Sequence, residues 1–433
     1  MNSPKSPLYA STVGHLDAAR AVLAHDADAL DEIAALRARL DEPMRIAIAG
    51  AVKSGKSTLL NALVAEEIAS TDATECTRLV TWYCDGDTPS VSMVHTDGGT
   101  RTLPMHRGTH QLHVDLGTTP EDDIARIQIT WPSTKLGSYT IIDTPGTASV
   151  SAAVSERTAR ALTPDGDQRP AADAVVYLMR NVRPEDLTFL RDVRTHLGGF
   201  VSDGSVIGVL SRIDELDGGQ MSALAFAQRR AAELTRTPEL AEVCHSVLPV
   251  AGLVALRAVT LRHDEFEALA ALARVDNEVF QSAMLSAARF TAPQSSLPLP
   301  QPTRAALVER FGMFGVRLSV IAILTGADTA AELAAELRRR SGLDELLRTI
   351  DAVVGQPAQE SRCRTALVGL LSLLADRDDE AARVGSDVRH VLADDHAFIE
   401  LLMPGRGRGA STQPLSQNAS MLRPRSDRRA CAR

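Results

Sequence analysis

A glycine-rich loop near the N-terminus has the residue types and spacing that bind phosphate. Residues 50–57 read Gly-Ala-Val-Lys-Ser-Gly-Lys-Ser, which matches the pattern G-x-x-x-x-G-K-S. The glycines let backbone N–H groups turn inward around phosphate oxygens, and the N-terminus of the following helix adds partial positive charge. The expected nucleotide contacts are Gly50, Ala51, Val52, Lys53, Ser54, Gly55, Lys56, Ser57 and Thr58.

Two residues of this loop have defined roles in such patterns. We expect Lys56 to reach the β- and γ-phosphates of a nucleoside triphosphate, and the Ser57 hydroxyl to ligate Mg²⁺. The alternative is a glycine-rich turn that binds nothing. An apolar run, 44–49, precedes the loop and a helical pattern, 57–65, follows it. Strand, glycine loop and helix in this order favour a nucleotide-binding unit.

A second motif, Asp143-Thr144-Pro145-Gly146, follows the apolar run 139–142. A carboxylate at a strand end can hold the Mg²⁺ shell through water, and a glycine three residues later can offer its N–H to the γ-phosphate. Loops of this kind move when the nucleotide is hydrolysed. The pattern D-x-x-G alone would equally mark a plain turn, but its place after a phosphate loop favours Asp143 and Gly146 as site residues.

A third motif, Ser211-Arg212-Ile213-Asp214, follows the apolar run 206–210. It is similar to the guanine motif N/T-K-x-D, in which the Asp carboxylate accepts two hydrogen bonds from guanine. Polar groups left unpaired by the wrong base can give discrimination of roughly 10⁴-fold. Arg212 replaces the usual lysine, and its methylene stem can still lie along the purine face. The alternative interpretation is a surface turn held by an ion pair.

Two fainter signals complete the expected site. Thr74 and Thr77 lie in the polar segment between the first helix and the strand pattern 78–84. One of them should close over Mg²⁺ and the γ-phosphate; we favour Thr77, and Thr74 stays the alternative. Val250 and Ala251 follow the last strand and occupy the place of a loop that contacts the base.

The elements that must position these motifs alternate between strands and helices from residue 44 to about 255. Short apolar or alternating runs predict strands at 44–49, 78–84, 91–95, 124–130, 139–142, 174–179, 206–210 and 247–250. Helical spacing lies between several of them, for example at 184–197. This alternation predicts an α/β P-loop head with a mainly parallel sheet flanked by helices.

Helical patterns flank the head on both sides. Residues 13–40 have helical spacing, as do most residues after 254. The expected divisions are 1–41, an N-terminal helix; 42–255, the GTPase head; 256–403, a second helical region; and 404–433, a disordered basic tail. The apolar run 311–327 is either a buried helix, which its Arg317 favours, or a membrane-inserting tip. The tail either binds anionic lipid or is left by a truncation or frameshift.

Composition excludes several classes. The formal net charge of −9 argues against nucleic-acid binding by the whole surface, and the 23% of charged residues indicate a soluble protein. No apolar run reaches the length of a membrane span, and residues 1–10 have no apolar core of a signal peptide. An odd number of widely spaced cysteines indicates free thiols in the cytoplasm: Cys76, Cys84, Cys244, Cys363 and Cys431.

The motifs taken in order resemble the dynamin superfamily. The segments are GAVKSGKST, ATECTRLVTW, DTPG and SRID, and the likeness runs from residue 46 to about 402. It includes residues 309–315 in the helical half. Within the bacterial dynamin-like GTPases, the sequence is most similar to the isoniazid-inducible group of mycobacteria.

This resemblance implies more than the residue patterns do. It implies GTP hydrolysis with Mg²⁺ and a head that forms a dimer when nucleotide is bound. It implies that residues 1–41 supply an N-terminal helix of a neck and that 256–403 form the rest of a helical neck and stalk. It also implies that the protein binds anionic lipid at the inner face of the cell membrane and remodels that membrane. A paralogous dynamin-like protein is the expected partner, and nucleic acid is not. Two alternatives stay open: a GTP-dependent switch acting on a protein partner, and a low-turnover subunit of a more active dynamin-like protein.

One departure concerns catalysis. Eukaryotic dynamins carry Gln-Ser where this sequence has Val52-Lys53, and that serine helps to hold a catalytic monovalent cation. Lys53 can place its ammonium near the same charge, or it is a solvated loop residue. No general base is evident, which suits phosphoryl transfer, where positioning and charge neutralisation dominate. The expected catalytic residues are Lys53, Lys56, Ser57 and Thr77.

Overall fold

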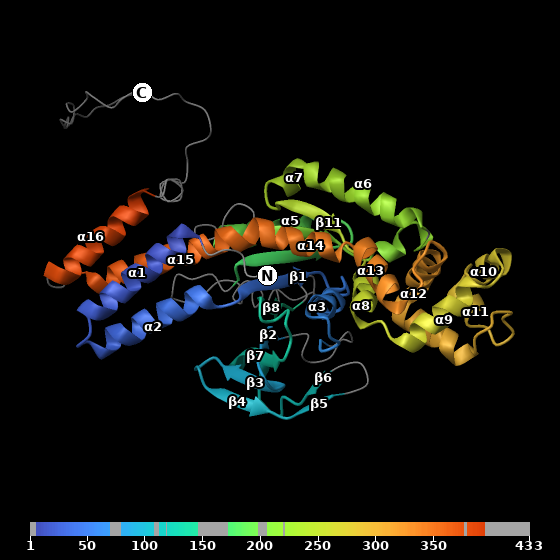
Figure 1. Ribbon diagram of the computed structural model, residues 1–433, viewed down its shortest axis with the longest axis horizontal. Coiled ribbons are helices and arrows are strands. Elements are labelled where there is room, and N and C mark those ends of the chain that lie inside the picture. The colour runs from blue at the N-terminus through green and yellow to red at the C-terminus, as the bar shows by residue number, and fades with distance from the viewer. Residues whose placement is uncertain are drawn as a thin grey trace, which may run out of the picture.

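The computed structural model in Figure 1 describes residues 6–69, 79–107, 112–117, 119–145, 172–197, 206–219, 221–375 and 379–394. The domain limits expected from the sequence stay predictions, and the basic tail 404–433 lies outside the described residues. No described helix is both long enough and apolar enough to cross a membrane.

A nine-stranded sheet forms the head, in the order β11-β10-β9-β1-β8-β2-β7-β3-β4. The strands are β1 (Met44–Gly50), β2 (Thr81–Asp85), β3 (Ser90–His95), β4 (Thr100–Leu103), β7 (Ile124–Trp131), β8 (Tyr139–Asp143), β9 (Ala174–Met179), β10 (Val206–Leu210) and β11 (Ser246–Pro249). A separate hairpin pairs β5 (Met105–Arg107) with β6 (Leu112–Val114). The fold is therefore the α/β head with a mainly parallel sheet that the sequence predicts.

The sheet has a parallel half and a mixed half. β11, β10, β9, β1 and β8 are parallel to one another, and their Val- and Ile-rich runs are buried, as strands covered on both faces must be. β2 runs antiparallel to β8 and parallel to β7, while β3 pairs antiparallel with β7 and with the edge strand β4. The carboxyl ends of the parallel strands thus meet at one edge, where ligands of such sheets bind.

Helices cover both faces of the sheet (Figure 1). They are α3 (Lys56–Val64), α5 (Pro184–Leu197), α6 (Ser222–Arg236), α7 (Pro238–Ala241) and α8 (Gly252–Thr260), with short 3₁₀ turns η2 (Glu121–Asp123) and η3 (Ile213–Gly219). Two large apolar clusters result, one on each side of the sheet. These clusters hold the strands and helices in place, and so position the loops at the edge of the sheet.

The neck is an antiparallel group of helices from both ends of the described chain. It contains α1 (Pro7–Val22), α2 (Ala27–Asp41), α15 (Gln356–Leu374) and α16 (Asp379–Asp394), whose apolar faces form a third cluster. The single helix expected over residues 13–40 is wrong. The chain breaks after Leu23, and the Asp26 carboxylate caps α2 by accepting the Ala29 N–H at 3.0 Å.

Four helices that follow the last strand of the sheet form a lobe on the opposite side of the head from the neck (Figure 1). The lobe comprises α9 (His263–Ala273), α10 (Asn277–Ala283), α11 (Ala287–Phe290) and α12 (Gln301–Leu324). The described helices between residues 263 and 394 are therefore divided among the lobe, the connecting helices that follow it, and the neck. Most of the apolar run 311–327 lies in α12, where Phe311, Phe314, Val316, Leu318 and Val320 are buried, while Leu324 at its end is exposed. The buried side chains support the buried-helix interpretation.

The chain returns from the lobe through α13 (Ala330–Ser341) and α14 (Leu343–Ile350), then enters the neck through the π-helix η4 (Asp351–Gly355). The Ala251 N–H donates to Ser341 O at 2.9 Å. Gly342 has a φ of 82°, and a β-carbon there would lie 2.2 Å from Pro249 O. The segment between residues 251 and 341, which contains the lobe, therefore begins and ends at the same closely packed place beside the sheet edge.

Candidate nucleotide site

The phosphate loop joins the end of β1 to the start of α3. Gly50 has a φ of 140°, and a β-carbon there would lie 2.3 Å from the backbone O of Leu178 on the neighbouring strand β9. Only glycine fits this approach. Gly55 caps α3 in the left-handed region, and Lys53 is also left-handed, with a φ of 62°. The loop therefore turns sharply and presents the N-terminus of α3 to the space above it.

Lys56 folds back over the loop. Its Nζ donates to Gly50 O at 3.0 Å and to Ala51 O at 3.1 Å. Burial lowers the pKa of Lys56, and the nearby carboxylate of Asp143 opposes this shift. The carbonyl oxygens of the loop thus hold the ammonium beside it. A charged phosphate group would accept a stronger hydrogen bond from the ammonium and could replace these neutral oxygens.

Asp143 stands at the end of β8, beside Ile48 of β1. Its Oδ1 is buried and has no hydrogen-bond partner among the described residues, and burial raises the pKa of this carboxyl to about 6 against the opposing charge of Lys56. Within the same part of the chain, Ser54 Oγ is also buried without a partner. Orphaned polar atoms at a strand end fit an Mg²⁺ shell, with Asp143 acting through water and the Ser57 hydroxyl at the start of α3.

The described residues contain no cluster of three or more His, Cys, Asp or Glu side chains suited to a metal. Mg²⁺ is commonly held by few protein groups, several waters and substrate phosphates. The Ser57 and Asp143 arrangement agrees with that coordination.

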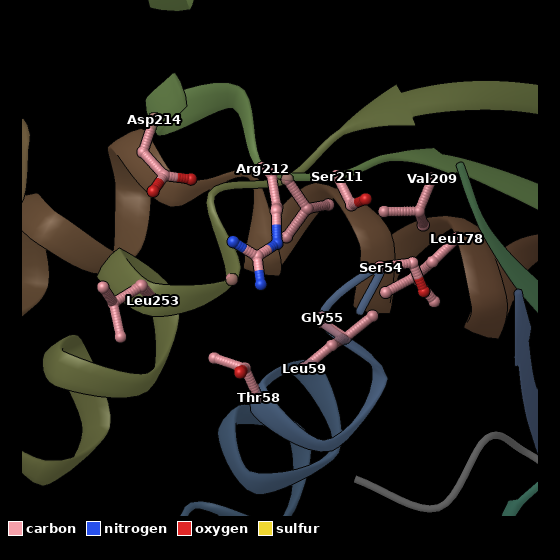
Figure 2. A pocket seen from close by; sticks show the side chains of 12 residues that line it. Ser54, Gly55, Thr58, Leu59, Leu178, Val209, Ser211, Arg212, Asp214 and Leu253 are labelled. Atoms are coloured by element: carbon pink, nitrogen blue, oxygen red, sulfur yellow. The ribbon is translucent and has the colours of Figure 1, made fainter. Parts of the chain in front are cut away.

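A pocket connects the phosphate loop to the guanine motif (Figure 2). It is lined by Ser54, Gly55, Thr58, Leu59, Leu178, Val209, Ser211, Arg212, Asp214, Val250, Gly252 and Leu253. The side chains of Arg212 and Asp214 extend into it from one side, and Thr58 of α3 faces them from the other. A base and ribose placed here would have apolar walls and a carboxylate at one end.

Arg212 is held in an unusual conformation. Its φ of 51° is uncommon for a residue with a β-carbon. Glu215 pairs with the Arg212 guanidinium and also with Arg180, at 2.7 Å. Burial raises the pKa of Asp214, and a backbone hydrogen bond opposes this rise, as do the weaker effects of Arg212 and Arg180. The motif is therefore both a charged turn, as the alternative interpretation supposed, and part of the pocket wall.

Several expected residues lie elsewhere. Ala251 is buried and does not line the pocket, since its N–H is bonded to Ser341. Ser211 lines the pocket but turns its hydroxyl to Met179 O at 3.2 Å. The expected switch residues, Thr74, Thr77 and Gly146, lie outside the described residues.

Sequence reasoning missed the apolar walls of the pocket. Leu178 and Val209 come from the carboxyl ends of β9 and β10, and Leu253 comes from the first turn of α8. One general rule could have indicated them: neighbouring parallel strands end at the same edge of the sheet, where ligands bind. Applying it requires the strand order, which the motifs alone do not supply.

The sequence is similar to those of known proteins. Residues 46–168 match the model of the dynamin family. Two curated relatives, the isoniazid-induced protein IniC of Mycobacterium tuberculosis strains H37Rv and CDC 1551, are each 42% identical over 377 residues, covering 87% of this chain and 76% of theirs. The chain belongs to the dynamin family of GTPases.

Solved structures with a similar arrangement include chains of an oligomerised bacterial dynamin pair, described as sensing and tethering membranes over long range. One is 16% identical, with 91% of this chain and 76% of that chain covered, at a TM-score of 0.34. A second is 14% identical, with 91% and 64% covered, at a TM-score of 0.33.

Proposed function

We propose that the chain binds GTP with Mg²⁺ and hydrolyses it to GDP and phosphate. The observation that carries this proposal is a pocket that runs from Ser54 of the phosphate loop and Thr58 of α3 to Arg212 and Asp214 of the guanine motif. Asp214 would accept two hydrogen bonds from guanine, and the Arg212 stem would lie along the purine.

Each phosphate-side residue has one task. Lys56 leaves its loop carbonyls to bind the β- and γ-phosphates, the Ser57 hydroxyl ligates Mg²⁺, and Asp143 orients a water of the metal shell. Lys53 neutralises the charge that develops on the transferring group, and Thr77 closes the metal side. Mg²⁺ held by the Ser57 hydroxyl, and by Asp143 through water, would neutralise phosphate charge, so catalysis would be positioning and electrostatics.

We also propose that hydrolysis is coupled to remodelling or maintenance of the inner membrane, with the chain as a peripheral protein on its cytoplasmic face. The support is family membership together with a helical neck built from both flanks of the head. The partners are GTP and GDP, a second copy through the head, a paralogous dynamin-like protein and anionic lipid. The alternatives are a regulatory switch and a low-turnover partner subunit.

GTP turnover with and without anionic liposomes tests the proposal, together with co-sedimentation. We expect magnesium-dependent phosphate release and nucleotide-dependent sedimentation with the lipid. Turnover without lipid binding would favour the regulatory switch. Tight GTP binding without turnover, alone and with lipid, would favour the partner subunit. The matched control is Lys56→Ala, which should abolish binding because it removes the main phosphate contact.

A further inference from the structure

The helical lobe reaches the base side of the nucleotide site. α12 packs against α8 and η3, which carry Leu253 and Asp214 of the pocket. At Gly312, α12 leaves helical geometry with a φ of 66°, and a β-carbon there would lie 3.4 Å from Leu253 Cδ2. One wall of the base pocket therefore rests on the lobe.

Four buried charges join the lobe to the other end of the P-loop helix. Glu67 follows α3, and its Oε1 accepts from Arg257 Nη1 of α8 at 2.5 Å and from Arg310 Nη1 of α12 at 3.3 Å. Arg310 Nε donates to Glu265 of α9. The four side chains are only 7% to 15% exposed, so solvent screens their interactions little.

The turn that carries Glu67 is fixed to α3. Asn61 is buried within α3, and its Oδ1 accepts the N–H groups of Ile68 at 3.0 Å and Ala69 at 2.7 Å. Its Nδ2 donates to Ala69 O at 3.0 Å. A displacement of Glu67 is therefore transmitted to α3, which begins with the phosphate-binding Lys56.

The charged cluster tolerates little independent movement of its members. Burial lowers the pKa of Arg257, and the charge of Arg310 lowers it further, because both guanidiniums approach the same carboxylate. Charges withdrawn from water are stable only while their partners stay in place, and removing one partner leaves the rest uncompensated. The cluster thus fixes the position of α12 relative to α3.

We propose that Glu67 and Arg310 are positioning residues that couple the nucleotide site to the helical lobe, so that bound nucleotide and lobe packing stabilise each other. The proposal rests on the proposed function in taking a guanine nucleotide as the ligand. Such coupling is reciprocal. If the cluster increases the affinity for nucleotide by some factor, bound nucleotide must stabilise the packed arrangement of the lobe by the same factor.

Amide hydrogen exchange of α9–α12 in the full chain, with and without GDP and Mg²⁺, tests the coupling. In the unmutated protein GDP should slow exchange in the lobe by about fivefold or more. Glu67→Gln and Arg310→Gln should still bind GDP, with affinity lowered by about fivefold or more, and the slowing in the lobe should be lost. The double variant removes one charge of each sign and provides a balanced form if a single variant fails to fold.

Arg362→Gln is the matched control. Arg362 of α15 is 11% exposed and pairs with Asp173 at 2.9 Å at the neck, away from the lobe. This variant should lower the melting temperature and leave the effect of GDP on the lobe unchanged.

Three outcomes overturn the coupling if GDP still binds. The first is that GDP fails to slow hydrogen exchange in the lobe of the unmutated protein, and the second is that GDP still slows it in the folded Glu67 and Arg310 variants. The third outcome is that GDP no longer slows exchange in the lobe of Arg362→Gln. An unmutated protein that binds no GDP overturns the proposed function, and with it this proposal.

Discussion

The phosphate end of the site holds polar atoms that the protein itself satisfies poorly. Among the described residues, Ser54 Oγ and Asp143 Oδ1 are buried without hydrogen-bond partners, and Lys56 Nζ donates to two carbonyl oxygens of its own loop. A buried unsatisfied polar atom costs roughly 1–3 kcal/mol. A nucleotide with its metal would offer these atoms partners and relieve this cost, which would contribute to the free energy of binding.

Asp143 should destabilise the nucleotide-free protein above about pH 6. Burial raises its pKa from 3.8 to about 6, so the folded chain binds this proton more tightly than the unfolded chain does. Stability therefore falls as the pH rises between these two pKa values. Asp143→Asn removes the ionisation and should raise the free energy of unfolding near neutral pH by roughly 1–3 kcal/mol, with no gain in acid.

Urea unfolding without nucleotide, followed across this pH range, measures the effect of Asp143→Asn. The control is Asp87→Asn at an exposed position, which should change little. An Asp143→Asn protein that is no more stable than the unmutated protein at neutral pH would contradict the argument.

Lys53 should act on turnover more than on binding. It is exposed, in the left-handed region of the phosphate loop, three residues before Lys56. Two lysines near one triphosphate repel each other when the site is empty and become favourable as charge develops in the transition state. Lys53→Ala should lower kcat by about tenfold or more and change GTP affinity only slightly. Steady-state kinetics in potassium and in sodium, which should agree, measure this. Normal turnover would make Lys53 a solvated loop residue.

At this scale the sequence predicts what is local. The residues of the phosphate loop and Asp214 follow from spacing within a few positions. Leu178 and Leu253 do not, because they meet the loop only through strand order and the packing of α8. The arrangement of Arg212, with its positive φ and its Glu215 partner, also depends on the folded turn.

The neck is the element whose stability depends most on contacts between distant segments. α1 and α2 precede the head, while α15 and α16 follow the lobe, and their apolar faces form one cluster. Leu36 of α2 is 3% exposed, and a β-carbon added at Gly369 of α15 would lie 3.1 Å from its Cδ2. The two helices therefore approach closely at this point.

Leu36→Ala should open a cavity in the neck and lower the free energy of unfolding by about 2–5 kcal/mol. Hydrogen exchange should show faster opening of α15 and α16, because they share the cluster with Leu36. The comparison variant is Leu324→Ala, whose side chain is 65% exposed and should have a small effect. Unchanged exchange in α15 after Leu36→Ala would count against a neck built from both flanks.

Elements with strong patterns are predictable, and those without are not. The buried runs of β9 and β10 coincide with the expected strands, because five or six apolar residues between turns leave few alternatives. The short edge strand β4 and the hairpin of β5 and β6 have no such run and were missed. The break between α1 and α2 was missed because the apolar spacing continues across it.

At the scale of the whole molecule, the helical parts form two groups on opposite sides of the head (Figure 1). The lobe lies within an excursion whose ends meet at the bond between Ala251 and Ser341. The neck is reached afterwards through α14 and η4. Helical periodicity indicates that these segments are helical. It does not give where each helix ends or which group it joins, since these depend on local breaks and on contacts far apart in sequence.

Competition binding with GTP and ATP tests the central claim, a guanine-nucleotide site, most directly. The unmutated protein should prefer GTP by roughly 10²- to 10⁴-fold, because ATP leaves the Asp214 carboxylate unpaired. Asp214→Ala should lose most of this preference with little change in melting temperature. Equal affinity of the unmutated protein for GTP and ATP would contradict the account.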